Sequence, residues 1–217
     1  MRYERKYKAE HLDFALVQQM VRLHPVGFKK IFPDRQINNI YLDTEDLTTY
    51  KENVMGIAER KKFRIRWYGD SVKQIQNPTF EIKIKNNLLG SKLSKPFPIF
   101  DLSEFYFLNY KKNKQVAQVQ SFATTEQELR PVLLNSYLRS YYGSPNGKFR
   151  ITIDKHLQYF SLLHSFSFEK YMIQDQGLVI ELKYEEQFDN QTDRITQYFP
   201  FRLTKSSKYV TGVDLTS

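Results

Sequence analysis

The sequence predicts an α+β domain in which antiparallel strands dominate and a few short helices pack against them. About six segments alternate charged and apolar residues with the two-residue period of a strand, while helical spacing occurs only over short stretches. The composition agrees, since 41% hydrophobic and 15% aromatic residues in a chain of 217 can build a core. We expect one domain over residues 1–217, because no repeat, linker or low-complexity segment interrupts the chain.

The first part of the chain is predicted to mix strands with two helices. Residues 10–24 place Leu12, Leu16 and Met20 on one helical face, and Pro25 ends that helix. A second helix begins after the N-cap candidate Thr44. The predicted elements of this part are strand 3–9, helix 10–24, strand 38–44, helix 45–56 and strands 60–70, 78–87 and 86–95.

The rest of the chain begins with a helical and connecting region over residues 101–135. Its ragged helical face contains Leu102, Phe105, Tyr106, Leu108 and Asn109, and Thr124 or Thr125 is the expected cap of a later helix. A turn at residues 144–147 should join two strands as a hairpin. The remaining predicted elements are strands 136–144, 147–160 and 178–186, a short helix 192–199 and a closing segment 204–213.

The charge and the missing cysteines restrict the function. A net charge of +9 favours a polyanionic partner such as nucleic acid, an anionic membrane or phosphate-rich small molecules. Without cysteine the chain has no disulfide, thiolate metal site or cysteine nucleophile. No apolar run approaches a membrane span, and the N-terminus lacks the apolar core of a signal peptide. We expect a cytoplasmic protein, which a separate membrane partner could hold at the inner face of a membrane.

The alternating strands carry an unusual excess of cations on one face. Antiparallel strands often have a charged face in water, so alternation alone needs no function. Like charges directly opposite each other destabilise a sheet, however, and two unit charges 4 Å apart repel by about 4 kcal/mol at an effective dielectric constant of about 20. The charged faces contain Glu4, Lys6 and Lys8; Arg60, Lys62, Arg64 and Arg66; Glu81, Lys83 and Lys85; Arg139; Arg150 and Asp154; and Glu181, Lys183 and Glu185.

Two arrangements of these faces are possible. The basic face could lie open to solvent, as on a nucleic-acid platform. Alternatively, the sheet could close with its charges inside and its apolar face covered by the helices at 10–24, 45–55 and 102–130. The second arrangement makes a tunnel lined with phosphate-binding groups.

Six short motifs in order resemble a known family. They are the Glu-x-Lys of YERKY, RIRWYG, EIK, the arginines and aspartate of LRSYY and FRITID, IELK, and TKSSKY. Together, from Tyr3 to about Val213, they resemble the VTC-type polyphosphate polymerase domain of the triphosphate tunnel metalloenzyme (CYTH-like) superfamily. The resemblance implies a closed antiparallel β-barrel, the triphosphate tunnel, with helices packed outside. It also implies metal-dependent transfer of the γ-phosphate of a nucleoside triphosphate onto polyphosphate, without a nucleic-acid partner.

The same resemblance assigns roles to individual residues. Arginine suits phosphate because its planar fork can engage two oxygens at once. The expected catalytic residues are Arg64, Arg66, Lys83, Arg139, Arg150 and Lys208. The expected substrate-binding residues are Lys6, Arg60, Lys62, Lys85, Lys92, Lys205 and Ser207, with Arg60 and Lys62 steering substrate from the rim.

A divalent metal, Mn²⁺ or Mg²⁺, is expected on Glu181, with Glu4 as a second ligand. Such hard cations need only one or two protein carboxylates when substrate phosphates supply other oxygens. Glu81 and Glu4 could instead pair with neighbouring lysines. The four histidines show no ligand spacing, and Trp67 and Tyr68 are expected to serve packing rather than base stacking.

One departure from the family bears on the reaction. Hydrolytic relatives begin with Glu-x-Glu-x-Lys, whereas this chain has Arg2, Glu4 and Lys6 in that register. The missing acid disfavours hydrolysis and suits transfer to phosphate. An inorganic or nucleoside triphosphatase, a non-catalytic polyphosphate-binding module and an open nucleic-acid platform remain the alternatives.

Overall fold

The computed structural model describes residues 2–87, 89–106, 114–163 and 171–217, and in them ten strands form one antiparallel sheet. The strands are β1 (Arg2–Ala9), β2 (Lys29–Asp43), β3 (Glu59–Tyr68), β4 (Thr79–Asn86), β5 (Leu89–Pro96), β6 (Arg130–Gly143), β7 (Phe149–Ser161), β8 (Ile173–Asp175), β9 (Leu178–Glu185) and β10 (Leu203–Thr204). The helices are α1 (Phe14–Arg22), α2 (Thr48–Met55), η1 (Leu102–Phe105), α4 (Lys114–Ala123), η2 (Glu186–Gln191), α5 (Asp193–Thr196) and α6 (Lys208–Thr216).

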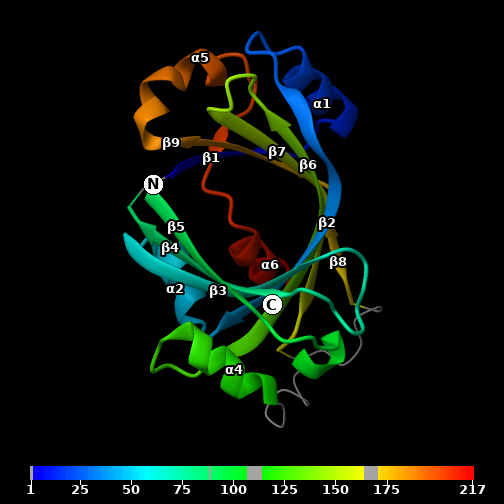
Figure 1. Cartoon of the computed structure of the whole chain (residues 1–217), viewed down its shortest axis with the longest axis vertical. Helices are drawn as coiled ribbons and strands as arrows, with labels where there is room; N and C mark the ends of the chain where they lie inside the picture. Colours follow the sequence, from blue (N-terminus) through cyan, green and yellow to red (C-terminus); the bar gives the residue numbers. More distant parts are fainter. Residues whose placement is uncertain (1, 88, 107–113, 164–170) are drawn as a thin grey trace.

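The sheet closes on itself, as predicted. Pairing runs in the order β1–β5–β4–β3–β2–β6–β7–β9 and returns from β9 to β1 (Figure 1). Most neighbouring strands pair over many residues, and β1 and β9 pair along their whole length. The joint between β1 and β5 consists, among the described residues, of the single pair Arg2 and Gly90. The open platform considered from the sequence is therefore excluded.

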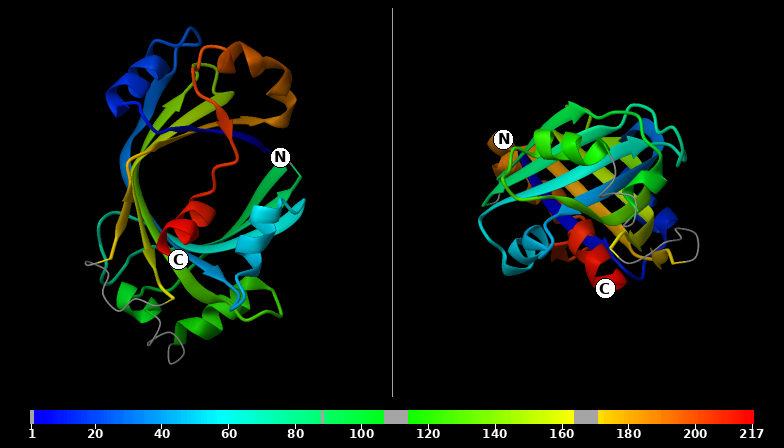
Figure 2. Two further views of the ribbon diagram at one scale, coloured as in Figure 1. Left: turned by 180° about the vertical axis from the view of Figure 1, so that it is seen from behind. Right: turned by 90° about the horizontal axis from the view of Figure 1, so that it is seen from below.

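Two apolar clusters cover the outside of the ring. On one side, outward residues of β2, β3 and β4, such as Ile40, Ile65 and Phe80, pack against η1 and α4. On the other side, outward residues of β1, β7 and β9 pack against Val17 and Val21 of α1 and the region of α5. Figure 2 shows these helices at opposite ends of the molecule. Burial of the apolar face outward leaves the alternate, charged face for the lumen.

Helix α6 packs on the inner face of the ring. Leu133 and Tyr159 alternate with outward-facing neighbours, and they contact α6 through the cluster that also holds Tyr209 and Val213. Figures 1 and 2 show α6 within the outline of the ring. Asp43 at the end of β2 accepts the hydroxyl of Tyr209, which ties α6 to the sheet. The end of the lumen opposite α6 is called the mouth below.

Several elements differ from the sequence prediction. Strand β2 begins at Lys29 rather than at residue 38, and β8 and η2 were not predicted. The helix expected after Thr124 or Thr125 is wrong, because residues 130–135 belong to β6. Val132, Leu133 and Leu134 are all buried, so this part of β6 lacks the alternation that identifies a strand. Leu108 and Asn109 lie outside the described residues.

Thr44 caps the start of α2, close to the N-cap position predicted for it. Its hydroxyl accepts the backbone N–H of Thr48, although Leu47 is the residue that formally precedes α2. None of the helices in the described ranges is both long and apolar enough to cross a membrane.

Candidate active site

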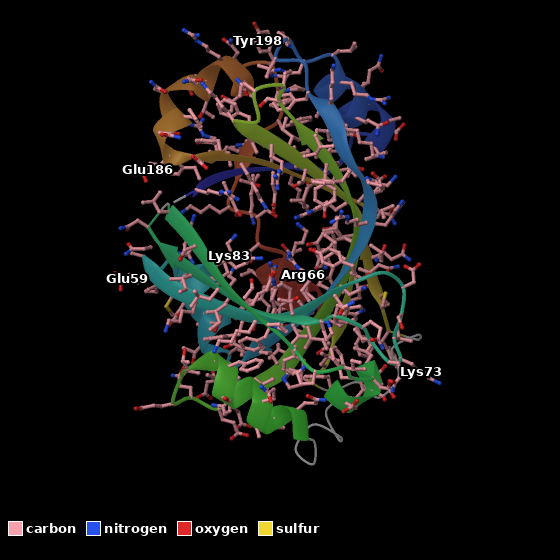
Figure 3. The ribbon with its side chains drawn as sticks, in the orientation of Figure 1. Glu59, Arg66, Lys73, Lys83, Glu186 and Tyr198 are labelled. Carbon is pink, nitrogen blue, oxygen red and sulfur yellow. The ribbon has the colours of Figure 1, made fainter. Side chains whose placement is uncertain are left out.

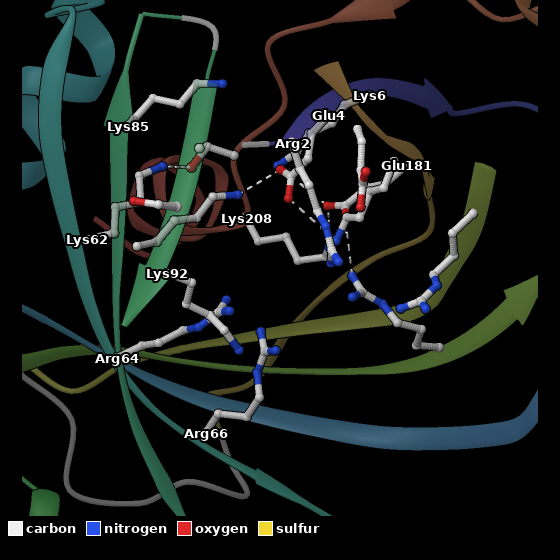
Figure 4. Close-up of a pocket in the computed structure, with 18 of the residues that line it drawn as sticks. Arg2, Glu4, Lys6, Lys62, Arg64, Arg66, Lys85, Lys92, Glu181 and Lys208 are labelled. Atoms are coloured by element: carbon white, nitrogen blue, oxygen red, sulfur yellow. Dashed lines mark hydrogen bonds and ion pairs between the residues drawn. The ribbon is translucent and has the colours of Figure 1, made fainter. Parts of the chain in front are cut away.

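The lumen of the ring contains a cavity of about 1070 Å³ whose wall is strongly basic (Figure 4). The twelve basic residues that line it are Arg2, Lys6, Lys62, Arg64, Arg66, Lys83, Lys85, Lys92, Arg139, Arg150, Lys183 and Lys208. Four acidic residues line it with them, Glu4, Glu181, Glu185 and Glu186. A concave site with this imbalance attracts and concentrates anions.

Glu81 neutralises the cations at the junction of β3, β4 and β5. It lies directly across from Arg64 in the β3–β4 pair, and its carboxylate is 2.6 Å from the Arg64 guanidinium and 2.7 Å from Lys92 Nζ. Arg66 is 3.7 Å away and donates its Nε–H to Asn39. Burial acts to raise the pKa of Glu81, but Arg64 and Arg66 outweigh it and lower the pKa to about 2.

Two further carboxylates, Asp154 of β7 and Glu181 of β9, lie together on the opposite wall. Asp154 accepts two hydrogen bonds from Arg139, one of them 2.7 Å long, and also contacts Lys208. Glu181 lies 2.9 Å from Lys183 and within 4 Å of three further cations, Lys6, Arg139 and Lys208. Burial favours neutral carboxyls, but these cations hold the pKa of both acids below their ordinary values.

Glu4 of β1 completes the acidic set. It accepts a 2.7 Å hydrogen bond from Lys83 across the lumen and lies 3.5 Å from Lys183. Burial again acts to raise the pKa of Glu4, and Lys183 and Lys83 outweigh it and hold the pKa well below its ordinary value. Lys183 thus lies between the carboxylates of Glu4 and Glu181.

A row of three lysines crosses strands β3, β4 and β5. Lys62 is directly opposite Lys83, which is directly opposite Lys92. Lys83 and Lys92 each reach a carboxylate, whereas Lys62 has no carboxylate partner among the described residues and instead donates to Ser207 Oγ at 2.8 Å. Such a row of like charges is unfavourable unless an anion binds it.

The pKa values of the lysines reflect their burial and the charges next to them. Burial and the neighbouring Lys6 and Lys83 hold the pKa of Lys62 well below its ordinary value. Burial also lowers the pKa of Lys83 to about 8, although Glu4 acts against this shift. Lys208 behaves oppositely, because Asp154 and Glu181 outweigh burial and raise its pKa. An incoming anion would supply Lys62 with the negative partner that it lacks among the described residues.

The structure brings most of the predicted site residues together in this cavity. Those that line it are Lys6, Lys62, Arg64, Arg66, Lys83, Lys85, Lys92, Arg139, Arg150, Ser207 and Lys208, with the predicted metal ligands Glu4 and Glu181. Figure 4 shows Arg64 and Arg66 reaching into the lumen from the wall opposite Glu4 and Glu181. Their roles in substrate binding and catalysis stay predictions.

Two predicted substrate-binding residues lie elsewhere. The guanidinium of Arg60 turns toward α2, where it donates to Asn53 at 3.1 Å and to the carbonyl oxygen of Ile57. Lys205 is exposed and does not line the cavity. Arg60 was expected to steer substrate from the rim and Lys205 to bind it from the closing segment, and neither side chain lines the cavity.

The sequence analysis assigned no site role to Asp154, Lys183 or Tyr137. Alternation did place Asp154 on a strand face with Arg150 and Lys183 on one with Glu181, as the structure shows. Tyr137 is buried beneath the cations, with Lys208 Nζ 4.8 Å and the Arg139 guanidinium 5.2 Å from its ring centre. Its ring supports these two cations in the orientation that faces the lumen.

The donor set suits a hard divalent cation only together with substrate. In the described part of the chain, no three His, Cys, Asp or Glu side chains meet as a ready metal site. Glu181 and Glu4 nevertheless present ionised carboxylates to one point, where the ammonium of Lys183 lies now. Mn²⁺ or Mg²⁺ could take these oxygens if phosphates supplied the remaining ligands.

The aromatic residues after Arg66 separate into two environments. Trp67 is buried on the outer face, as its predicted packing role requires, and its indole N–H donates to the carbonyl of Ser71. Tyr68, expected to pack in the same way, is instead 51% exposed. Among the histidines, His24 is buried and contacts the carbonyl of Ile195, and His164 lies outside the described residues.

Comparisons with known proteins agree with this geometry. The model of the VTC domain family matches residues 1–217. A candidate adenylate cyclase from Vibrio parahaemolyticus has a similar structure, with a TM-score of 0.53, 14% identity and coverage of 96% of this chain and 97% of that chain. No curated protein sequence matches the chain.

Two further solved structures share the fold. A candidate adenylyl cyclase from Hippeastrum, described as having a dominant triphosphatase activity, gives a TM-score of 0.51 at 12% identity, with 100% of this chain and 97% of that chain covered. A candidate adenylate cyclase from Bacillus halodurans gives 0.52 at 14% identity, with 95% and 94% covered. The family match and the basic lumen together indicate a triphosphate-related function of the tunnel-enzyme type.

Proposed function

Because the chain belongs to the VTC domain family, we propose that it is a polyphosphate polymerase that transfers the γ-phosphate of a nucleoside triphosphate onto a growing polyphosphate chain. The observation that carries the proposal is the cavity inside the closed ring of strands, which twelve basic and four acidic residues line. A linear polyanion matches such a lumen in charge along its whole length, whereas a compact neutral substrate would leave the lysine row uncompensated.

Four carboxylates that pair with the cations of the lumen support transfer rather than hydrolysis. Water must lose a proton to attack phosphorus, and an efficient general base has a pKa near the working pH. Glu4, Glu81, Asp154 and Glu181 all have lowered pKa values, and Lys or Arg side chains occupy their oxygens. The terminal oxygen of polyphosphate is already anionic at neutral pH, so it can attack without such a base.

The basic side chains would act by position and charge. Arg64 and Arg66 of β3 and Lys208 of α6 reach into the same cavity (Figure 4), which Arg139 of β6 also lines, so a phosphate chain in the lumen would meet cations from several sides. As the γ-phosphoryl group moves, negative charge spreads over its equatorial oxygens, and fixed cations stabilise that charge without reorganising. Glu81 and Asp154 hold Arg64 and Arg139 in place before substrate arrives.

The metal has a limited and defined part in this proposal. Bound on Glu181 and Glu4, it would neutralise phosphate charge and orient the triphosphate. Arg2 lines the cavity where hydrolytic relatives have their first acid, so a second metal would lack a ligand there. This local difference supports transfer over triphosphate hydrolysis.

The experiment incubates the purified protein with ATP and Mn²⁺ and separates long polyphosphate from orthophosphate on a gel. The proposal expects one phosphate unit added to polymer for each ADP released, and loss of both products in Arg64→Ala and Glu181→Ala. Orthophosphate without polymer would select the triphosphatase. Polyphosphate binding without turnover, unchanged in Glu181→Ala, would select a binding module.

A further inference from the structure

Three aromatic rings surround one arginine at the ends of β2, β3 and β6 that lie away from α6, just beyond the residues that line the cavity. The guanidinium carbon of Arg35 lies 5.1 Å from the ring centre of Phe32, 5.7 Å from Tyr141 and 6.0 Å from Tyr68. The rings of Phe32 and Tyr141 meet edge to face, 5.8 Å apart. We call Phe32, Arg35, Tyr68 and Tyr141 the mouth cluster.

The mouth cluster continues the phosphate-binding walls. Tyr68 is two residues beyond Arg66 on the lumen face of β3, and Tyr141 is two residues beyond Arg139 on that of β6. Two strand residues span roughly 7 Å, about the step from the last phosphate of a nucleotide into its sugar and base. Arg35 is directly opposite Arg139 in the β2–β6 pair, so the cluster lies directly beside a cation of the cavity wall.

The cluster is exposed although its rings are large. Phe32 is 41% and Tyr68 51% exposed, whereas Tyr41 and Tyr137 deeper in the lumen are buried. Neither ring is needed to fill the apolar clusters of the fold, since none of these includes them. Exposed aromatic rings beside an arginine can stack on a nucleobase with little regard to which base it is, and here Arg35 lies over one face of each ring.

We propose that the mouth cluster binds the base of the nucleoside triphosphate while its triphosphate enters the cation-lined lumen. This inference rests on the proposed function, because it assigns the donor a place relative to the same cavity. It makes the preferred donor a nucleotide rather than inorganic triphosphate. Purines, which present the larger ring, should be favoured over pyrimidines, with little distinction between ATP and GTP.

The test compares the affinities of ATP and tripolyphosphate by calorimetry at one pH and salt concentration. In Tyr68→Ala the affinity for ATP should fall about tenfold while that for tripolyphosphate is unchanged. Tyr68→Phe, which keeps the ring, should retain the ATP affinity. Tyr198→Ala is the matched control, since Tyr198 is 53% exposed and lies at the far end of the molecule from Arg66 (Figure 3).

A second measurement uses 2-aminopurine riboside triphosphate, whose fluorescence is quenched by stacking. The wild-type protein should quench it and Tyr68→Ala should restore the emission. Wild-type protein that binds ATP and tripolyphosphate equally well, or a Tyr68→Ala variant that loses both equally, overturns the inference and leaves the proposed function intact. Wild-type protein that binds neither triphosphate overturns the proposed function itself.

Discussion

Glu81 lies 2.6 Å from Arg64 in a lumen whose excess charge is positive. The same carboxylate reaches Lys92 and approaches Arg66, so one buried acid on β4 compensates three cations from the two neighbouring strands, β3 and β5. Its presence explains how β3 and β4 can pair with arginines and lysines facing one cavity before any anion is bound. From the sequence, Glu81 and Glu4 could pair with neighbouring lysines, and the structure shows both pairs, Glu81 with Lys92 and Glu4 with Lys83.

Replacement of Glu81 should test this compensation. In Glu81→Gln, three cations lose their common partner, and the free energy of unfolding should fall by about 3 kcal/mol. Tripolyphosphate should restore much of the loss, because it supplies the missing negative charge to the same side chains. Thermal denaturation with and without tripolyphosphate measures both effects.

Glu59→Gln is the control, because Glu59 lies at the exposed start of β3 (Figure 3). An equal loss in both variants, or a Glu81→Gln loss that tripolyphosphate leaves untouched, would contradict the account.

Replacement of Lys62 should change the stability of the ligand-free protein in the opposite direction. It has no carboxylate partner in the described structure, so Lys62→Ala removes repulsion within the lysine row without leaving an acid unpaired. The ligand-free protein should gain up to about 1 kcal/mol of stability, while tripolyphosphate affinity falls about tenfold.

Lys61→Ala on the exposed outer face of the same strand should change neither quantity, which makes it the matched control. Denaturant unfolding and calorimetry distinguish the two variants. A Lys62→Ala protein that is less stable and binds as well as the wild type would refute the prediction.

Anion binding should depend on pH through Lys83. Its pKa of about 8 means that it is charged below that pH and becomes neutral as the pH rises above it. Because only the charged form attracts phosphate, the affinity for tripolyphosphate should decrease between about pH 8 and pH 9.5. Binding in this range should also take up a proton, visible as a buffer-dependent heat in calorimetry.

Lys83→Arg keeps the positive charge throughout this range and should flatten the decrease. An identical pH profile in wild type and Lys83→Arg would assign the dependence to another group.

The packing of α6 offers a test of how the rear of the lumen is built. A Cβ added at Gly212 would collide with side-chain atoms of Leu133 and lie 2.6 Å from Tyr159. Gly212→Ala should therefore push α6 away from β6 and β7, lower the free energy of unfolding by about 2 kcal/mol and displace Lys208 from Asp154. Weaker tripolyphosphate binding should accompany the loss.

Leu215→Ala, on an exposed part of the same helix, is expected to leave binding unchanged. Wild-type stability in Gly212→Ala would show that α6 can shift at little cost.

Much of the cavity wall could be predicted from the sequence because strand alternation is a local property. Once Phe63, Ile65 and Trp67 are assigned to an apolar outer face, Lys62, Arg64 and Arg66 must share the other face. The same reasoning places Glu181 with Lys183 and Arg150 with Asp154. Alternation did not predict the strand at residues 130–135, because these residues are buried on both faces and so do not alternate between polar and apolar.

The sequence by itself determined which side chains share each strand face and that those faces are mostly basic. Only the tertiary structure decided that the faces converge on one lumen, that Glu81 and Asp154 hold the arginines, and that Arg60 turns away toward α2. The physical reason is the separation along the chain over which each effect acts. Alternation depends on neighbours along one strand, whereas charge compensation depends on pairs such as Glu4 and Lys83, which only closure of the sheet brings within 2.7 Å.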